Sequence, residues 1–251
     1  MSPVERVLRW EGCYNVRDLG GLETASGGRT RHGGVVRADN VRRLTVAGWE
    51  EASRHGVRRV LDLRFDTEAV EQEALPGGIE LVAVSLFGTY DAEHARTYEE
   101  RVRASTDVAP IFAAGYVRTL EEGSDRVASA VAAVADADAS GTVVVHCFAG
   151  KDRTGIVTAL LLSLAGVPDE VVASDYAASG PGVEILSQSW FDEAETEDEL
   201  AFRRRMCASP AAAMTGVLGW LRESHGGAES YLRGAGLTGA QVEALRHRLV
   251  G

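Results

Sequence analysis

Residues 141–166, GTVVVHCFAGKDRTGIVTALLLSLAG, constrain the fold more than any other part of the chain. The run begins as a short β-branched strand, passes through a loop that contains Gly150, and ends as an apolar helix from Thr154 to Gly166. A strand and a helix with so few polar positions must be covered on most sides. The pattern therefore predicts the interior of a protein in which strands and helices pack together.

The remaining segments extend this alternation through the first two-thirds of the chain, and helical patterns alone follow. We expect strands at 25–38 (with a hairpin), 57–64, 78–87 and 141–146, a loop or solvated helix at 88–107, and helices at 44–56 (capped by Thr45), 66–75, 108–123, 124–138, 154–166, 168–179, 182–206, 210–226 and 237–250. This order predicts one α/β domain over residues 1–251, with a mainly parallel central sheet flanked by helices and a helix-rich C-terminal third. The loop at 147–153 would then lie at the carboxyl end of a central strand, where open α/β sheets place their sites.

Charge and cysteine content limit the partners of the chain. A formal net charge of −11 over 251 residues argues against general binding to nucleic acid or to anionic membranes. The three cysteines, Cys13, Cys147 and Cys207, are widely spaced and odd in number, which predicts reduced thiols and no disulfide framework. The N-terminus lacks the apolar run of a signal peptide, and no stretch approaches ~20 apolar residues. We expect a cytoplasmic protein without membrane insertion; export without a classical signal stays open.

The loop HCFAGKDRTG combines residue types that suit a tetrahedral dianion. A tight loop at a helix N-terminus presents backbone N–H groups, and the helix dipole adds positive potential. Gly150 allows the tight fold, and Arg153 can direct two donors at phosphate oxygens. Helix N-termini and cations favour the thiolate form of a cysteine, so we expect Cys147 to attack phosphorus and form a phosphocysteine that water hydrolyses.

Two neighbours of this cysteine have supporting roles in this interpretation. We expect His146 to hold the loop by side-chain hydrogen bonds without transferring protons. Thr154 can donate its hydroxyl to the sulfur of Cys147 and so ease its departure in the second step. By contrast, we expect Cys13 and Cys207 to serve as small apolar side chains.

At these residues the sequence resembles the cysteine-dependent phosphatases, whose signature is HCxxxxxR followed by Ser or Thr. The lysine and aspartate of HCFAGKDRTG are similar to the loop of the bacterial protein tyrosine phosphatase family of the protein tyrosine phosphatase B type. The resemblance extends over nearly the whole chain, through landmarks at NVRDLGG (15–21), GVVRADN (34–40), GVRRVLDLR (56–64), VVASDY (171–176) and the closing residues 231–251. It implies a cysteine-phosphatase-like fold and hydrolysis of phosphotyrosine, and in some members of phosphoserine, phosphothreonine or phosphoinositides. It implies neither metal nor organic cofactor, with orthophosphate as product and inhibitor.

The resemblance also implies roles position by position. Cys147 matches the nucleophile and Arg153 the phosphate clamp, while Lys151 and Asp152 match an additional charged pair. Lys151 can accept extra negative charge on the substrate, and Asp152 orients Arg153, positions the water or acts as an acid. The substrate-binding loop comprises Phe148, Ala149, Gly150, Lys151, Asp152 and Arg153.

A general acid should protonate the leaving group, and its identity is the open point of the site. The loop after the strand at 78–87 reads FGTYDAE, which makes Asp91 the first candidate. Asp62 and Asp66 are further candidates, although an aspartate in DLR more often makes structural hydrogen bonds. We interpret Arg17 and Asp18 of NVRDLGG as structural in the same way.

The charged segment 182–207 has two interpretations, a solvated surface helix or, as the resemblance implies, a helical lid with Trp190, Phe191 and Phe202 as its apolar underside. Three alternatives to a tyrosine phosphatase stay open. A phosphoinositide phosphatase is suggested by Lys151, a sulfur-transfer enzyme would use a similar cysteine loop, and a phosphate-binding pseudophosphatase would keep the fold without catalysis. Against the last, a mere binder has no use for the nucleophile Cys147. The sequence does not indicate an oligomeric state.

Overall fold

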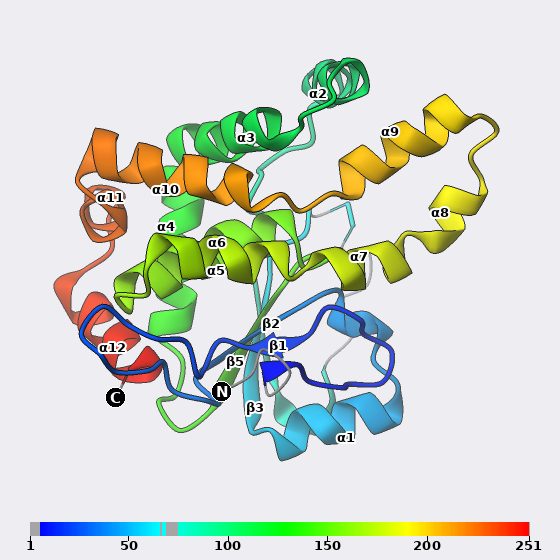
Figure 1. The fold of residues 1–251 in the computed structure, drawn as a ribbon. Coiled ribbons are helices and arrows are strands. Elements are labelled where there is room, and N and C mark those ends of the chain that lie inside the picture. Colours follow the sequence, from blue (N-terminus) through cyan, green and yellow to red (C-terminus); the bar gives the residue numbers. More distant parts are fainter. Residues whose placement is uncertain (1–5, 66, 69–74, 251) are drawn as a thin grey trace.

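A five-stranded sheet runs through the middle of the protein (Figure 1), whose computed structural model describes residues 6–65, 67–68 and 75–250. Its strands are β1 (Arg17–Asp18), β2 (Val35–Ala38), β3 (Val57–Asp62), β4 (Glu80–Ala83) and β5 (Thr142–His146). Their order across the sheet is β1-β2-β5-β3-β4; β1 is antiparallel to β2, and the other neighbouring pairs are parallel. The predicted α/β class with a mainly parallel sheet is confirmed.

The central strand β5 is buried along its whole length, as its β-branched sequence predicts. Val143 and Val145 contribute to the core on one face of the sheet, and Val144 contributes to the core on the other. Parallel pairing aligns His146 with Ala38 of β2 on one side and with Asp62 of β3 on the other. The chain therefore leaves β5 at a point where three strands end together.

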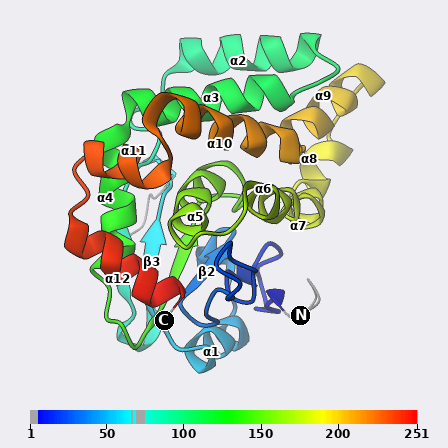
Figure 2. The ribbon, with the colours of Figure 1, turned by 60° about the vertical axis from the view of Figure 1, so that its left-hand side comes forward.

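Helices cover the two faces of the sheet unequally (Figures 1 and 2). The smaller core lies beneath α1 (Val46–Arg54) and includes Trp10, Ala52 and Val144. The larger core lies on the opposite face, where α5 (Asp152–Leu164) is buried on almost every side, as its apolar sequence predicts. The other helices are η2 (Val41–Arg43), η3 (Pro76–Gly78), α2 (Ala92–Ala104), α3 (Ala109–Glu122), α4 (Ser124–Ala135), α6 (Asp169–Ala177), α7 (Gly180–Leu186), α8 (Gln188–Asp192), α9 (Glu197–Cys207), α10 (Ala211–His225), α11 (Ala228–Gly234) and α12 (Gly239–Leu249).

The local predictions in the first half of the chain have mixed outcomes. Thr45 caps α1 as expected, because its hydroxyl accepts the N–H of Gly48. The segment 88–107 is mainly the helix α2, the second of the two forms that its polar sequence allows. The helix predicted at 66–75 falls largely on residues 66 and 69–74, which lie outside the described residues, and so does the candidate acid Asp66.

The charged segment predicted as one helix over 182–206 consists of three helices, α7, α8 and α9. The chain turns at Ser187 between α7 and α8. It restarts at Thr196, whose hydroxyl accepts the N–H of Glu199 at 3.1 Å. A hydroxyl that caps a new helix competes with continuation of the old one, which explains the break. Of the three aromatic residues expected on the apolar side of this segment, Phe191 and Phe202 are buried, whereas Trp190 is exposed.

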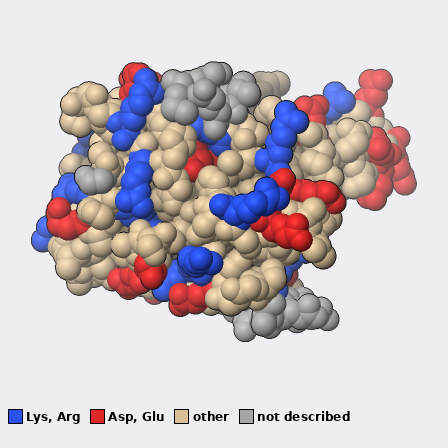
Figure 3. Space-filling view, turned by 90° about the horizontal axis from the view of Figure 1, so that it is seen from below, with Lys and Arg blue, Asp and Glu red and all other residues tan. Residues whose placement is uncertain are grey.

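In Figure 1 this segment projects from the rest of the molecule. Seen from below, carboxylates gather at the end of the projection, whereas the remainder of that face mixes both signs (Figure 3). The exposed acidic residues there are Asp192, Glu193, Glu195, Glu197 and Asp198. Separately, no helix within the described ranges is both long enough and apolar enough to cross a bilayer.

Candidate active site

The loop after β5 is shorter than the sequence predicts, because α5 begins at Asp152 and not at Thr154. Arg153 therefore lies in the first turn of the helix. Lys151 occupies the capping position without a side-chain cap, so the first N–H groups of α5 are left for another partner. A helix start of this kind, directly after a buried strand, is suited to bind an anion.

Three successive carbonyl groups of the loop point away from it into hydrogen bonds with neighbouring segments. The carbonyl of Phe148 accepts the N–H of Asn40 at 3.0 Å, and that of Ala149 accepts Nδ2 of Asn15 at 2.9 Å. The carbonyl of Gly150 accepts Nη2 of Arg37 at 2.8 Å. In a planar trans peptide the N–H lies opposite the C=O, so the next three N–H groups all point to the other side. This alignment produces a cradle of backbone donors.

Arg37 is fully buried, and its charge is balanced by Asp175 of α6 at 2.8 Å. Arg17 and Arg6 bind the same carboxylate. Burial alone would raise the pKa of Asp175, but Arg17, Arg37 and Arg6 outweigh it and lower the pKa well below its ordinary value. Asn15, Arg37 and Asp175 are support residues that sequence reasoning did not assign, although each lies in a segment that carries the family resemblance.

Gly150 adopts a backbone conformation that other residues rarely adopt, with φ of +66°. A Cβ atom at this position would lie 2.5 Å from the carbonyl oxygen of Ala38. The glycine is therefore required both by the turn and by the close approach of the loop to the end of β2. This is the role that the sequence predicted for it.

Cys147 is a buried free thiol at the start of this loop. The expected hydrogen bond between Thr154 and the sulfur is not formed: Oγ1 of Thr154 is buried and has no hydrogen-bond partner among the described residues. A buried hydroxyl without a partner is costly unless a ligand or water satisfies it. Because Thr154 directly follows Arg153, its hydroxyl is available to donate a hydrogen bond beside the cradle.

Arg153 is paired with Glu68, a residue that sequence reasoning missed. Both terminal nitrogens of the guanidinium bind the carboxylate, Nη2 at 3.1 Å from Oε1 and Nη1 by a shorter contact with Oε2. The rings of Phe65 and Phe87 lie 5.0 Å and 5.4 Å from the guanidinium carbon. Burial would lower the pKa of Arg153, but the charges of Cys147, Glu68 and Asp152 raise it. The side chain is thus fixed in position and remains cationic.

His146 is completely buried, and its Nδ1 lies 3.0 Å from the carbonyl oxygen of Cys147. Burial lowers its pKa to about 4, against the opposing charge of Asp62. A neutral imidazole that donates from Nδ1 agrees with the expectation of a loop-holding residue. Asp62 is also structural: it accepts three hydrogen bonds from the side chain of Arg64 and one from its N–H.

The side chains of Lys151 and Asp152 are both bound by other groups of the protein. Nζ of Lys151 donates to the carbonyls of Met206 at 2.7 Å and Ala208 at 3.1 Å, at the end of α9. The same ammonium lies 3.4 Å from Oδ1 of Asp152, which also accepts the hydroxyl of Tyr116. The ammonium of Lys151 is therefore directed toward the α9 end, and not kept open for an additional substrate charge.

Asp91 lies at the surface and caps α2, where its carboxylate accepts the N–H groups of Glu93 and His94 at 3.0 Å each. The hydrogen bond from the N–H of His94 contributes most to a lowered pKa. Both N–H groups hold this carboxylate at the start of a surface helix, and within the described part of the chain none of its hydrogen bonds reaches the loop at 147–153. The geometry therefore gives Asp91 a capping role and does not support its assignment as the general acid.

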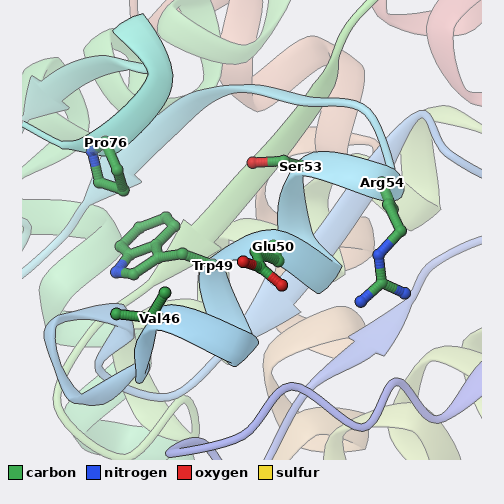
Figure 4. Close-up of a pocket in the computed structure, with 6 residues that line it drawn as sticks. All are labelled: Val46, Trp49, Glu50, Ser53, Arg54 and Pro76. Atoms are coloured by element: carbon green, nitrogen blue, oxygen red, sulfur yellow. The ribbon is translucent and has the colours of Figure 1, made fainter.

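Two hollows lie near these elements. One of about 260 Å³ lies between α7, α8 and α9, and Ala208, which binds Lys151, is part of its lining together with Gly180, Phe191 and Cys207. The other, of about 450 Å³, lies over α1, where the Trp49 ring sits between Val46 and Pro76 (Figure 4). None of the residues lining the second hollow belongs to the loop at 147–153. The ring of Phe148 is 58% exposed and forms part of the outer surface of the loop.

Comparison with known proteins identifies the family of the chain. The model of the tyrosine phosphatase family matches residues 8–251. The chain is 28% identical to the triple specificity protein phosphatase PtpB of Mycobacterium tuberculosis, over 96% of this chain and 98% of that protein. It is 30% identical to a tyrosine-protein phosphatase of Nostoc commune, over 85% of this chain and 73% of that protein. The chain therefore belongs to the tyrosine phosphatase family, and the prediction of a protein tyrosine phosphatase is confirmed.

Proposed function

We propose that Cys147 is the nucleophile and that residues 147–153 hold the phosphate of a phosphotyrosine side chain. The observation that carries this proposal is the outward orientation of the carbonyls of Phe148, Ala149 and Gly150, which turns the following N–H groups to one side. Such donors are most effective when they are fixed before the charge develops. The buried Arg37 and Asn15 fix them here.

The reaction has two balanced steps. In the first, the thiolate sulfur of Cys147 forms a bond to phosphorus while the bond from phosphorus to the phenol oxygen breaks, and that oxygen takes a proton from Asp152. In the second, a water molecule forms the new P–O bond and gives its proton to Asp152, and the S–P bond breaks. The free hydroxyl of Thr154 donates to the departing sulfur. Orthophosphate is released.

Arg153 binds the oxygen atoms of the phosphoryl group during both steps. A guanidinium has five N–H donors, and Glu68 uses one on each terminal nitrogen. The Nε donor and the second donors of the two terminal nitrogens remain for phosphate. Glu68 therefore orients the guanidinium of Arg153 and leaves these three donors available for phosphate.

We assign proton transfer to Asp152 and not to Asp91. Asp152 opens α5 beside the cradle, and its side chain is one-third exposed, with one carboxylate oxygen held by Tyr116. Asp91 is engaged as the cap of a surface helix.

Phosphotyrosine is favoured over phosphoinositides. The phosphoinositide alternative depended on Lys151, but its ammonium is bound by the carbonyls of Met206 and Ala208 and lies 4.6 Å from the ring centroid of Phe112. The mycobacterial relative is named a triple specificity protein phosphatase, which supports a substrate range wider than phosphotyrosine. We propose phosphoserine and phosphothreonine as further substrates. We also propose that the chain acts as one domain. Because the mechanism needs Cys147 without a disulfide bond, we propose that the protein works in a reducing compartment such as the cytoplasm.

Hydrolysis of para-nitrophenyl phosphate under reducing conditions tests the proposal. We expect turnover by the wild type, none by Cys147→Ser, and near wild-type turnover by Cys13→Ser. Cys13 is a matched control, because burial raises its pKa and disfavours a thiolate there. A catalytically inactive wild type would overturn the proposal. Equal rates on phosphotyrosine and phosphoinositide would overturn the substrate assignment.

A further inference from the structure

Two buried tyrosines form a hydrogen-bonded chain that ends on Asp152. Tyr116 of α3 bonds to Oδ1 of Asp152, and its hydroxyl oxygen lies 2.8 Å from that of Tyr176 of α6. The two rings meet edge to face, with an interplanar angle of 74° and centroids 6.0 Å apart. Helices that are distant in the sequence therefore converge on one carboxylate of the phosphate loop.

The direction of donation between these hydroxyl groups follows from the number of protons available. Each hydroxyl has a single proton to donate. Burial raises the pKa of Tyr116 and of Tyr176, so both hydroxyls stay protonated. If Tyr116 donates to the carboxylate of Asp152, it has none left for Tyr176, and Tyr176 must donate to Tyr116. The order of donation is Tyr176 to Tyr116 to Asp152.

This arrangement distinguishes the two oxygens of Asp152. Oδ1 receives the hydroxyl of Tyr116 and lies 3.4 Å from Nζ of Lys151. Among the described residues, none forms a hydrogen bond or ion pair with Oδ2, which is therefore the oxygen left to exchange a proton. A general acid must present one oxygen within hydrogen-bonding reach of the leaving group, so fixing the other oxygen orients the side chain.

The last glycine of HCFAGKDRTG has a role in this arrangement. A Cβ atom on Gly155 would lie 2.9 Å from Cδ2 and 3.3 Å from Cε2 of Tyr176. Glycine is unfavourable inside a helix, and here it makes room for the ring that begins the chain of donors. The motif thus accommodates a residue that lies 21 positions after it in the sequence.

We propose that Tyr116 and Tyr176 are positioning residues for proton transfer by Asp152. Tyr116 holds Oδ1, and Tyr176 holds the hydroxyl of Tyr116 in the orientation in which it donates to the carboxylate. This inference rests on the proposed role of Asp152 in the phosphatase reaction. It adds two residues, on α3 and α6, to a site that the motif alone confines to one loop.

The test compares two leaving groups. Phenyl phosphate needs protonation of its leaving oxygen, whereas dinitrophenyl phosphate leaves readily without it. For Tyr116→Phe we expect kcat/KM to fall about 10- to 100-fold with phenyl phosphate and less than about threefold with dinitrophenyl phosphate. Tyr176→Phe should show the same pattern with a smaller loss. Asp152→Asn should show it with the largest loss.

Tyr231→Phe is the matched control, because Tyr231 is a buried tyrosine whose hydroxyl donates to a backbone carbonyl, that of Leu120, at 2.6 Å. It should leave kcat/KM unchanged with both substrates. Equal losses with both substrates in Tyr116→Phe and Tyr176→Phe would show simple packing and overturn the inference, while the assignment of Asp152 would stand. If Asp152→Asn itself lacks the leaving-group pattern, Asp152 is not the acid, and both the assignment and the inference fail.

Discussion

Glu68 holds Arg153 through both carboxylate oxygens, with Nη2 at 3.1 Å from Oε1 and Nη1 bound to Oε2. The N–H of Phe65 fixes the same carboxylate at 2.8 Å. The phosphate clamp is therefore oriented by a carboxylate from the segment after β3. Burial tends to raise the pKa of Glu68, but Arg153 lowers it, so the pair stays ionised at neutral pH.

Glu68→Gln removes the charge and keeps the shape of this partner. We expect kcat/KM for para-nitrophenyl phosphate to fall about 10- to 100-fold, and the inhibition constant of orthophosphate to rise, because the guanidinium loses a charge-assisted bond. Glu80→Gln, which removes the carboxylate 2.7 Å from Arg59 at the sheet edge, should change neither value. Tighter orthophosphate binding in Glu68→Gln would show instead that Glu68 competes with phosphate for Arg153.

Gly150→Ala should abolish the phosphate cradle. The added Cβ meets the carbonyl oxygen of Ala38 at 2.5 Å, and a φ of +66° is unfavourable for alanine. We expect orthophosphate binding, measured by calorimetry, to be lost, and the free energy of unfolding to fall by about 2 kcal/mol or more. Gly166→Ala is the control, since its φ is +74° but no atom lies within 4 Å of the added Cβ. Its cost should be limited to about 1 kcal/mol, with phosphate binding intact.

How much of this site could be predicted depends on how local each relationship is. The strand, the loop and the helix around Cys147 are adjacent in sequence, so their order and their α/β setting follow from residue patterns. Arg37 and Asn15 act on the loop across more than a hundred residues, and no pattern pairs them with a particular carbonyl. Glu68 belongs to an acidic stretch in which nothing distinguishes it from its neighbours until Arg153 is placed beside it.

The proton donor illustrates the same limit. Asp91 and Asp152 are both plausible by residue type and position along the chain. Only the fold shows that Asp91 caps α2 and that Tyr116 of α3 reaches Asp152. The sequence likewise does not predict the break of 182–206 into three helices. Thr196 can either cap a new helix or continue an existing one, and packing decides which of the two it does.

The stability of the protein should depend on pH through His146. Its pKa is lowered from 6.5 to about 4 by burial, so between these values the unfolded chain binds a proton that the folded chain excludes. Above pH 6.5 the titration of His146 therefore does not reduce the free energy of unfolding. As the pH decreases from 6.5 toward 4, this free energy falls by about 1.4 kcal/mol per pH unit, and by about 3 kcal/mol over the whole window.

Urea unfolding at pH 7 and pH 4.5 measures this effect. His146→Asn, which can still donate to the carbonyl of Cys147, should lose markedly less stability between the two conditions than the wild type. The exposed His247→Asn should follow the wild type. Identical losses in the wild type and His146→Asn would contradict a neutral buried imidazole.

Lys151 should couple the loop to the segment 182–207, which we propose as a lid. The ammonium binds the carbonyls of Met206 and Ala208 at the end of α9. Hydrogen exchange should be fast in α8 and α9 of the free enzyme and slower with orthovanadate bound. Lys151→Met keeps the apolar stem and should accelerate exchange at residues 204–208. Equal protection of α8 and α9 with and without orthovanadate would show that the segment 182–207 does not act as a lid.

The phosphocysteine intermediate can be trapped by acid-quenched turnover. Wild-type protein mixed with para-nitrophenyl phosphate, quenched within one turnover, and analysed by peptide mass spectrometry should carry one phosphoryl group on Cys147. The peptides with Cys13 and Cys207 should carry none, and Cys147→Ser should neither turn over nor become labelled on a cysteine. Turnover that persists in Cys147→Ser, or a phosphoryl group found on another residue in the wild type, would contradict the account.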